Sequence, residues 1–406
     1  MINKKIGAKI VLALGAFALF FTACKSMPAA QGGMKMKKGM ELAAWEGEWV
    51  SADSVKNDPS LEAAYRDTAA EMPNYTVDGF KAAISDMYRT PVIKAKFDGS
   101  NTVLFTVLDK EKKQVEIPCE YKYMGKVPIP GYKGSFWHTF EAVKDVRGLT
   151  GVKYFIAVAP GRHGEGLLHW HGRFGRYSID WLVNGDTSWP TYFPVSTSNE
   201  EMAKNFGEGI KAMPQLLPKD PFESYAKFGK WISSSFIYDD MSKEVENVYA
   251  KLIKEFAGKN PKGGDFTKQE IIAEMKSNDM SAASVDDFSH LEFSIQDGKN
   301  ELTVYKDGKE VFRSTYKRVA ASSSKPYMTM QADRKDAGKF SLISFVVVHG
   351  AAPNQHFHLW YGASEKELGA LKGTPTCYVD GRPAAVIAEQ VEKSCRKKLQ
   401  ALTEKK

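Results

Sequence analysis

Two short His-x-His segments are the residues of this sequence most suited to chemistry. His356 and His358 stand two apart, and so do His169 and His171. In an extended strand, residues two apart lie on the same face, with Cα atoms roughly 6.5–7 Å apart. Two imidazoles at this spacing can converge on one metal ion, because zinc–nitrogen bonds are about 2.0–2.1 Å long. Each segment therefore predicts a pair of metal ligands.

A further histidine precedes each pair. His349 follows an apolar run at 342–348 that predicts a strand, and residues 350–355 predict a loop before the pair. A hairpin there would bring His349 beside the pair as a third neutral nitrogen ligand. His163 stands at a similar place before the other pair. One isolated pair is as well explained by surface or core histidines, and the duplication favours metal binding.

Length and charge limit the classes of function. The chain has 406 residues, 43% of them hydrophobic, which predicts two or three domains with a large core. The net charge of +7 is spread as short lysine and arginine tracts among many acids. These tracts are typical of solvated faces or membrane-surface contacts, and we expect no nucleic-acid partner.

The N-terminus has the pattern of a secretory signal. A basic segment and an apolar run at 10–21 are followed by Thr22-Ala23-Cys24, and the run is too short for a membrane span. The end of this segment resembles a bacterial lipobox. We therefore expect a signal peptide at 1–23, a lipid on Cys24 and a flexible tether at 24–43. The predicted location is the bacterial cell envelope, anchored to a membrane and facing the periplasm or the cell surface.

Three other cysteines remain in the chain. Cys377 and Cys395 can form a disulfide in an oxidising compartment. Cys119 is left over and is expected to be a buried strand residue.

The chain predicts two copies of one plan. We expect a first domain at 44–213, a linker at 214–228, whose start is interrupted by three prolines, and a second domain at 229–406. In each copy, helical patterns come first and strands follow, and after the histidine pair come a Pro-Thr dipeptide and a terminal helix. Asp-Gly pairs between alternating strands predict hairpins, as at Asp297-Gly298 and Asp307-Gly308. The fold class is mainly β with flanking helices, with antiparallel sheets that close into barrels.

The order of these features resembles the ZinT (YodA) family of extracytoplasmic zinc-binding domains. The likeness is sharpest from the pair at 169–171 to Trp189-Pro190-Thr191-Tyr192, and residues 356–376 repeat it more loosely. The resemblance implies two calycin- or lipocalin-like barrels in tandem, each with a zinc site near the barrel mouth. It also implies that the ligands are the pair, a preceding histidine and a histidine in the final helix.

The resemblance assigns His356, His358 and His349 as metal ligands of the second copy, and His169, His171 and His163 as metal ligands of the first. The histidine of the final helix is absent from both copies. Glu208 and Cys395 stand near that place and are the candidate fourth ligands, with water as a further alternative.

The function expected from these observations is a lipid-anchored binder of Zn²⁺ or another divalent transition metal, which captures or buffers the ion or passes it to an uptake transporter. Imidazole also suits copper, nickel and iron, so ligand type alone does not select zinc. An alternative is a barrel that carries an apolar small molecule or haem. A zinc-dependent hydrolase is a third class, for which Glu165 is the only nearby general base, and we expect no enzyme activity.

Overall fold

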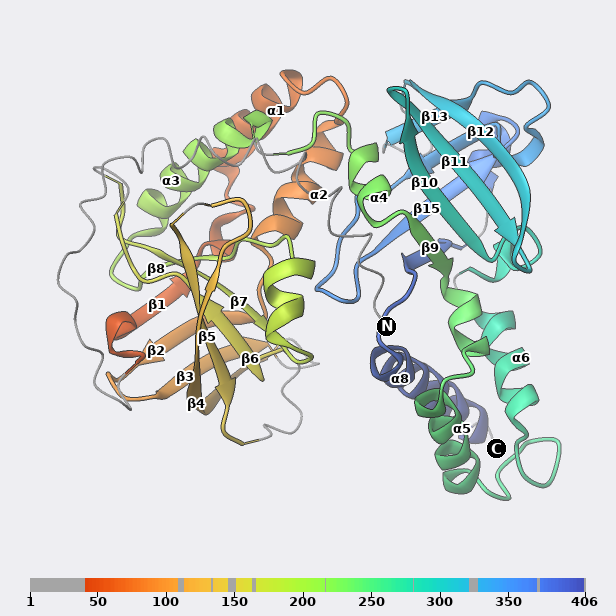
Figure 1. Cartoon of the computed structure of the whole chain (residues 1–406), viewed down its shortest axis with the longest axis horizontal. Coiled ribbons are helices and arrows are strands. Elements are labelled where there is room, and N and C mark those ends of the chain that lie inside the picture. Colours follow the sequence, from red (N-terminus) through yellow and green to blue (C-terminus); the bar gives the residue numbers. More distant parts are fainter. Residues whose placement is uncertain are drawn as a thin grey trace. The chain divides into compact units, whose positions relative to one another are not determined.

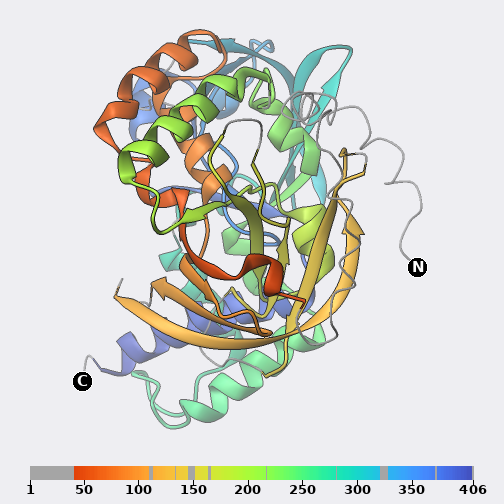
Figure 2. The same ribbon diagram turned by 90° about the vertical axis from the view of Figure 1, so that its left-hand side faces the viewer.

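The structure is a computed structural model that describes residues 41–108, 113–132, 134–144, 151–162, 166–215, 217–279, 281–320, 328–370 and 373–404. These residues form two compact units that divide between Lys219 and Asp220, except that residues 74–79 group with the second unit. Each unit contains a closed antiparallel barrel of eight strands, which can be followed in Figure 1 and from the side in Figure 2. The predicted fold class, two such barrels with flanking helices, is confirmed.

The first barrel takes its strands in chain order. They are β1 (Gly47–Ser51), β2 (Val92–Phe97), β3 (Thr102–Leu108), β4 (Gln114–Pro128), β5 (Phe136–Ala142), β6 (Tyr154–Ala157), β7 (Trp170–Gly175) and β8 (Thr191–Pro194). The barrel closes where β1 pairs with β8, with Val50 opposite Phe193. Every strand of this barrel therefore pairs with two neighbouring strands.

Aromatic side chains fill the first barrel. Trp170 stacks on Tyr192 with ring centroids 4.3 Å apart, and Phe155 stacks on Phe174 at 4.9 Å. Trp170, Tyr192 and Phe155 are each at most 1% exposed. Full burial of such side chains contributes about 1.5–3 kcal/mol each, so this interior is a packed core.

Within the described residues, α-helices α1 to α3 accompany the first barrel. They are α1 (Glu62–Ala70), α2 (Val77–Tyr88) and α3 (Asn199–Ala212). Helix α3 begins at a capping box, in which the Ser198 hydroxyl accepts from the Glu201 amide and the Glu201 carboxylate accepts from the Ser198 amide. This pairing satisfies amide groups that the first helical turn leaves without partners.

The second barrel is closed in the same way by its first strand. Its strands are β9 (Lys230–Ser233), β10 (His290–Gln296), β11 (Lys299–Lys306), β12 (Lys309–Val319), β13 (Met328–Ala332), β14 (Leu342–Phe345), β15 (His356–Gly362) and β16 (Thr376–Val379). Strand β9 pairs with both β10 and β16. The turns between β10 and β11 and between β11 and β12 are the predicted Asp-Gly hairpins, because Asp297, Gly298, Asp307 and Gly308 all have positive φ.

The second unit has a separate layer of helices. The helices of this unit are α4 (Phe222–Phe228), α5 (Lys243–Glu255), α6 (Lys268–Asn278), α7 (Glu365–Ala370) and α8 (Ala384–Thr403). Helices α5, α6 and α8 share an apolar cluster that includes Val245, Ile271 and Val391. Helix α4 lies in the segment expected to be a linker, and its Phe222 and Tyr225 are buried in the core of the second barrel.

Two local expectations differ from the structure. The strand expected at 342–348 ends at Phe345, and Val346–Val348 leads out of it towards His349. Cys377 and Cys395 are both free thiols, because Cys377 lies in the barrel core and Cys395 lies in the helical cluster. Cys119 is a buried strand residue, as predicted.

Candidate metal centre

Strand β15 places His356 and His358 on one face. The residue between them, Phe357, is fully buried in the core of the second barrel, and so is Leu359. Because side chains alternate along a strand, both imidazoles lie on the opposite face of the barrel wall. Their ring centroids are 5.4 Å apart. The predicted convergence of these two rings is therefore present.

The loop before β15 brings His349 to the same place. His349 and His356 form an antiparallel bridge, in which each amide donates to the other's carbonyl at 2.9 and 2.8 Å. The His349 ring lies 4.3 Å from that of His356 and 5.2 Å from that of His358. Among the residues that the structure describes, these three form a group whose ligand atoms all lie within 4.8 Å of one another.

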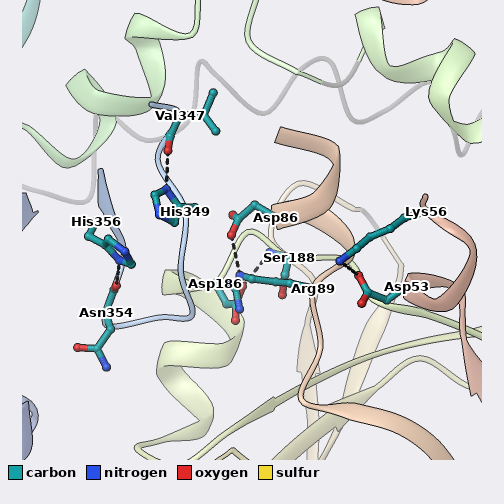
Figure 3. Close-up of polar contacts among 10 residues, drawn as sticks. All are labelled: Asp53, Lys56, Asp86, Arg89, Asp186, Ser188, Val347, His349, Asn354 and His356. Carbon is teal, nitrogen blue, oxygen red and sulfur yellow. Dashed lines mark hydrogen bonds and ion pairs between the residues drawn. The ribbon is translucent and has the colours of Figure 1, made fainter. Parts of the chain in front are cut away.

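Hydrogen bonds fix which nitrogen of each ring carries the proton. Nδ1 of His349 lies 2.7 Å from the Val347 carbonyl, and Nδ1 of His356 lies 2.9 Å from the Asn354 carbonyl (Figure 3). A carbonyl oxygen only accepts, so both Nδ1 atoms are donors. The Nε2 atom of each ring therefore holds the lone pair that a metal ion needs.

The third ring is oriented by a hydroxyl group. Nδ1 of His358 lies 2.9 Å from Oγ1 of Thr376, the residue opposite it on β16. The same hydroxyl donates its proton to the Thr374 carbonyl at 3.0 Å, so it accepts from the imidazole. The amide of Thr376 in turn donates to the buried Ser281 hydroxyl at 2.7 Å. Such partners of a ligand histidine set its tautomer and its direction.

Burial keeps two of the ligands neutral. It lowers the pKa of His356 to about 4, and the neighbouring His349 and His358 lower the pKa of His356 further. Burial and His349 lower the pKa of His358 to about 4 as well. Neutral imidazole is the form that binds a metal ion, so at neutral pH no proton has to leave either ring.

An arginine supports the loop that carries these ligands. The guanidinium of Arg382 lies 4.2 Å from the centroid of the Tyr378 ring, which lies 5.2 Å from the His356 ring. Arg382 also donates to the side chain of Asn354 at 3.0 Å and to that of Gln390 at 2.8 Å. Asn354 is thereby held where its carbonyl accepts from His356.

The first domain repeats the pair. Nδ1 of His169 lies 2.8 Å from the Leu167 carbonyl, and Nδ1 of His171 lies 3.0 Å from the Thr191 hydroxyl. That hydroxyl donates to the Trp189 carbonyl at 3.3 Å, as Thr376 does to Thr374. The two rings are 5.0 Å apart at 75°, compared with 5.4 Å and 78° in the second domain.

The third position differs between the domains. Gly161 forms the bridge with His169 that His349 forms with His356, with both hydrogen bonds present at 2.9 and 3.0 Å. The place of His349 is therefore taken in the first domain by a residue without a side chain. His163 and Glu165 lie outside the described residues.

The candidate fourth ligands lie elsewhere in the described structure. Cys395 is buried among the apolar residues of α5, α6 and α8, where burial raises the pKa of its thiol to about 12. Glu208 is exposed on α3 and forms an ion pair with Lys211 at 2.9 Å. Neither belongs to the group of three histidines. Cys24, the expected lipid site, is outside the described residues.

Sequence reasoning missed the threonines that orient the rings. Thr191 and Thr376 each follow a proline at the same place in the two copies, and this repeated Pro-Thr pair was the available signal. Their role depends on the pairing of β7 with β8 and of β15 with β16, which a sequence does not specify.

Fold and site together define a tandem barrel protein with a three-histidine group in the second barrel. Residues 34–208 match the sequence model of a family described as "ZinT (YodA) periplasmic lipocalin-like zinc-recruitment". The first domain is thus similar to the ZinT family over these residues, and the second barrel supports the predicted tandem copy.

Curated relatives and solved structures are similar to part of the chain. The zinc-binding lipoprotein AdcA of two Streptococcus pneumoniae strains is 28% identical over 171 residues, which are 41% of this chain and 32% of the relative. This chain thus matches about a third of the length of these relatives. The Zn(II)-bound ZinT-like domain of AdcA is 25% identical with a TM-score of 0.32, and covers 43% of this chain and 92% of that domain. Zn(II)-bound AdcA is 25% identical with a TM-score of 0.33, and the match covers 42% of this chain and 36% of that chain.

Proposed function

We propose that this protein binds Zn²⁺ outside the cytoplasm, and that His349, His356 and His358 hold the ion. The observation that carries the proposal is the convergence of three imidazoles whose ligand atoms lie within 4.8 Å of one another and whose Nδ1 atoms are all engaged, which leaves their Nε2 atoms for a metal ion. The family match of the first domain and the name of the AdcA relatives support zinc as the ion.

The ligand set fits zinc chemically. Zinc in proteins is bound tetrahedrally at about 2.0–2.1 Å from nitrogen, which places ligand atoms roughly 3.3 Å apart. The described nitrogens lie within 4.8 Å of one another, so small ring movements bring them to that separation. Three protein ligands leave the fourth position to water or to an exogenous donor, which suits a site that must also release its ion.

Metal binding is favoured over the two alternative functions, a zinc-dependent hydrolase and a carrier of an apolar molecule or haem. The group contains histidines alone among the described residues, and it includes no carboxylate that would serve as a general base. In the first barrel, Phe105, Phe155 and Trp170 occupy the interior that an apolar ligand or haem would need. We therefore propose a protein that captures, buffers or hands over zinc without transforming a substrate.

The site is tested by metal content. We expect the full chain to lose about one equivalent of zinc, measured by mass spectrometry, when two of three ligands are removed in His356→Ala/His358→Ala. The matched control is His138→Ala/His290→Ala, which removes two histidines outside both clusters and should retain the wild-type content. Equal zinc in the ligand variant and the wild type, with circular dichroism unchanged, would refute the site.

We also propose that Cys24 carries a lipid that anchors the protein to a membrane, where a metal-uptake transporter would be the partner. The signal-like N-terminus and the lipoprotein name of the AdcA relatives support this location. Within the described residues, no helix has the length and apolarity to cross a bilayer. Cys24→Ser should move the protein from the membrane to the soluble fraction of cells, and its retention with the membrane would exclude the lipid anchor.

A further inference from the structure

Hydrogen bonds connect the metal centre of the second domain to the helical layer of the same domain. This layer consists of α5, α6 and α8, which share one apolar cluster and are labelled in Figure 1. One connection starts at Asp279, the residue that follows α6, and leads to His358. The other starts at Gln390, in the second turn of α8, and leads to His356.

The connection to His358 is a chain of donors that ends on a carboxylate. The amide of Thr376, whose hydroxyl orients His358, donates to the Ser281 hydroxyl at 2.7 Å. The Ser281 hydroxyl lies 2.8 Å from that of Ser234, which donates its own proton to Oδ1 of Asp279 at 2.6 Å, so Ser281 donates to Ser234. Oδ1 of Asp279 also accepts from the Ser281 amide at 2.7 Å. The end of α6 thereby fixes Ser281, and Ser281 fixes the strand residue that orients His358.

The connection to His356 passes through a buried arginine. Arg382, which is 5% exposed, donates through Nη1 to Oε1 of Gln390 at 2.8 Å and to Oδ1 of Asn354 at 3.0 Å. The carbonyl of Asn354 accepts from Nδ1 of His356, as Figure 3 shows. The Arg382 guanidinium also lies 4.2 Å from the Tyr378 ring, which lies 5.2 Å from the His356 ring. Gln390 thus holds the arginine that supports the loop and the ring beside this ligand.

We propose that Ser281 and Gln390 are positioning residues of the metal site, through which the helical layer holds His358 and His356 in the directions that binding needs. This inference rests on the proposed function, because positioning is measured first as zinc affinity. A ring that is already held in place loses little conformational entropy when the ion binds. The helical layer therefore contributes to zinc affinity although it supplies no atom to the group of three histidines.

One experiment compares two serines by calorimetric titration of the full chain with zinc. Ser281→Ala and Ser284→Ala each remove a fully buried hydroxyl from the same short segment, and the Ser284 hydroxyl donates to the Ser281 carbonyl at 2.8 Å. We expect Ser281→Ala to weaken zinc binding by ~10-fold and Ser284→Ala to leave it unchanged. A folded Ser281→Ala protein that binds zinc as tightly as the wild type would overturn the role of Ser281.

Gln390 is only partly buried, so replacing it spares the core and keeps the proposal testable if the serine variants do not fold. Gln390→Leu removes the acceptor for Arg382 and should weaken zinc binding by ~10-fold. Gln390→Glu retains an acceptor and should bind nearly as tightly as the wild type. The matched control is Gln400→Leu, at an exposed position of the same helix. Equal zinc affinities of Gln390→Leu and the wild type would overturn the role of Gln390.

Nitrogen-15 spectra of the imidazoles in the metal-free full chain separate this inference from the proposed function. The hydrogen bond of each ring sets which nitrogen carries its proton, so wild-type His356 and His358 should both be protonated at Nδ1. We expect a second tautomer for His358 in Ser281→Ala and for His356 in Gln390→Leu. A wild type that binds no zinc would refute the zinc site, and the spectra would still decide on positioning. Unchanged spectra and unchanged affinities in both variants, with zinc bound by the wild type, would overturn this inference alone.

Discussion

The hydroxyl of Thr376 lies 2.9 Å from Nδ1 of His358, and this hydroxyl donates a hydrogen bond to the carbonyl of Thr374. Thr376 is 6% exposed, so water does not readily replace it. The proton on Nδ1 therefore has one acceptor, and the direction of Nε2 depends on it.

Thr376→Val should weaken zinc binding by ~10–100-fold, because valine keeps the shape but removes the acceptor. Thr376→Ser restores the hydroxyl and should bind nearly as tightly as the wild type. Calorimetric titration of the full chain measures both. The matched change Thr191→Val, in the first domain, should leave zinc binding by the three histidines of the second domain unchanged. An equal effect of the two valine variants would contradict the role of Thr376.

Local sequence signals predicted the parts of the fold that depend on neighbouring residues. The Asp-Gly turns adopt the positive φ angles that two-residue hairpins require, and the capping box at Thr267 and Glu270 forms as its spacing indicates. The His-x-His spacing likewise places both rings on one face, because alternation along a strand is a local property.

Long-range pairing accounts for what the sequence did not predict. Strand β13 (Met328–Ala332) pairs with β12 and β14, and a single sequence does not specify such pairing. The alignment of Gly161, rather than His163, with His349 depends on which residue pairs with His169. The contacts of Thr376 and Arg382 with the site could not be predicted from the sequence either, since their partners lie on other elements.

The free thiols give a prediction about reactivity. Burial raises the pKa of Cys395 to about 12 and that of Cys377 still higher, and Cys119 is buried as well. Thiolate is the reactive form, so native Cys24→Ser protein should react slowly with Ellman's reagent at pH 8. In denaturant without reductant, all three remaining thiols should react. If only one thiol reacted in denaturant, Cys377 and Cys395 would be joined by a disulfide.

His138 gives the first domain a pH-dependent stability. Its ring lies 5.3 Å from that of Trp45, and burial lowers its pKa from 6.5 to about 4. Between these values the unfolded chain binds a proton that the folded chain does not. The free energy of unfolding should therefore fall as pH drops from about 6.5 to about 4, and this loss should stop below about 4.

His138→Gln removes this contribution. In the presence of a chelator, denaturant unfolding should show a smaller loss of stability between pH 7 and pH 5 for the variant than for the wild type. His356 and His358 titrate in the same range in both proteins, so their contribution cancels in the comparison. Identical pH profiles would mean that His138 can be protonated without cost in the folded state.

Gly350 is required by the packing of the metal site as well as by its backbone. Its φ is +100°, and a Cβ there would lie 2.8 Å from the Asn354 carbonyl oxygen and 2.9 Å from Nδ1 of His356. Gly350→Ala should therefore distort the hydrogen bond that orients His356 and weaken zinc binding by ~10-fold or more.

The matched control is Gly381→Ala, where φ is +78° and a Cβ meets nothing within 4 Å. Both variants should lose roughly 1–2 kcal/mol of stability to left-handed backbone strain, measured by denaturant unfolding. Calorimetry should find the loss of affinity in Gly350→Ala alone, and equal affinities would show that the His356 ring adapts to the added methyl group.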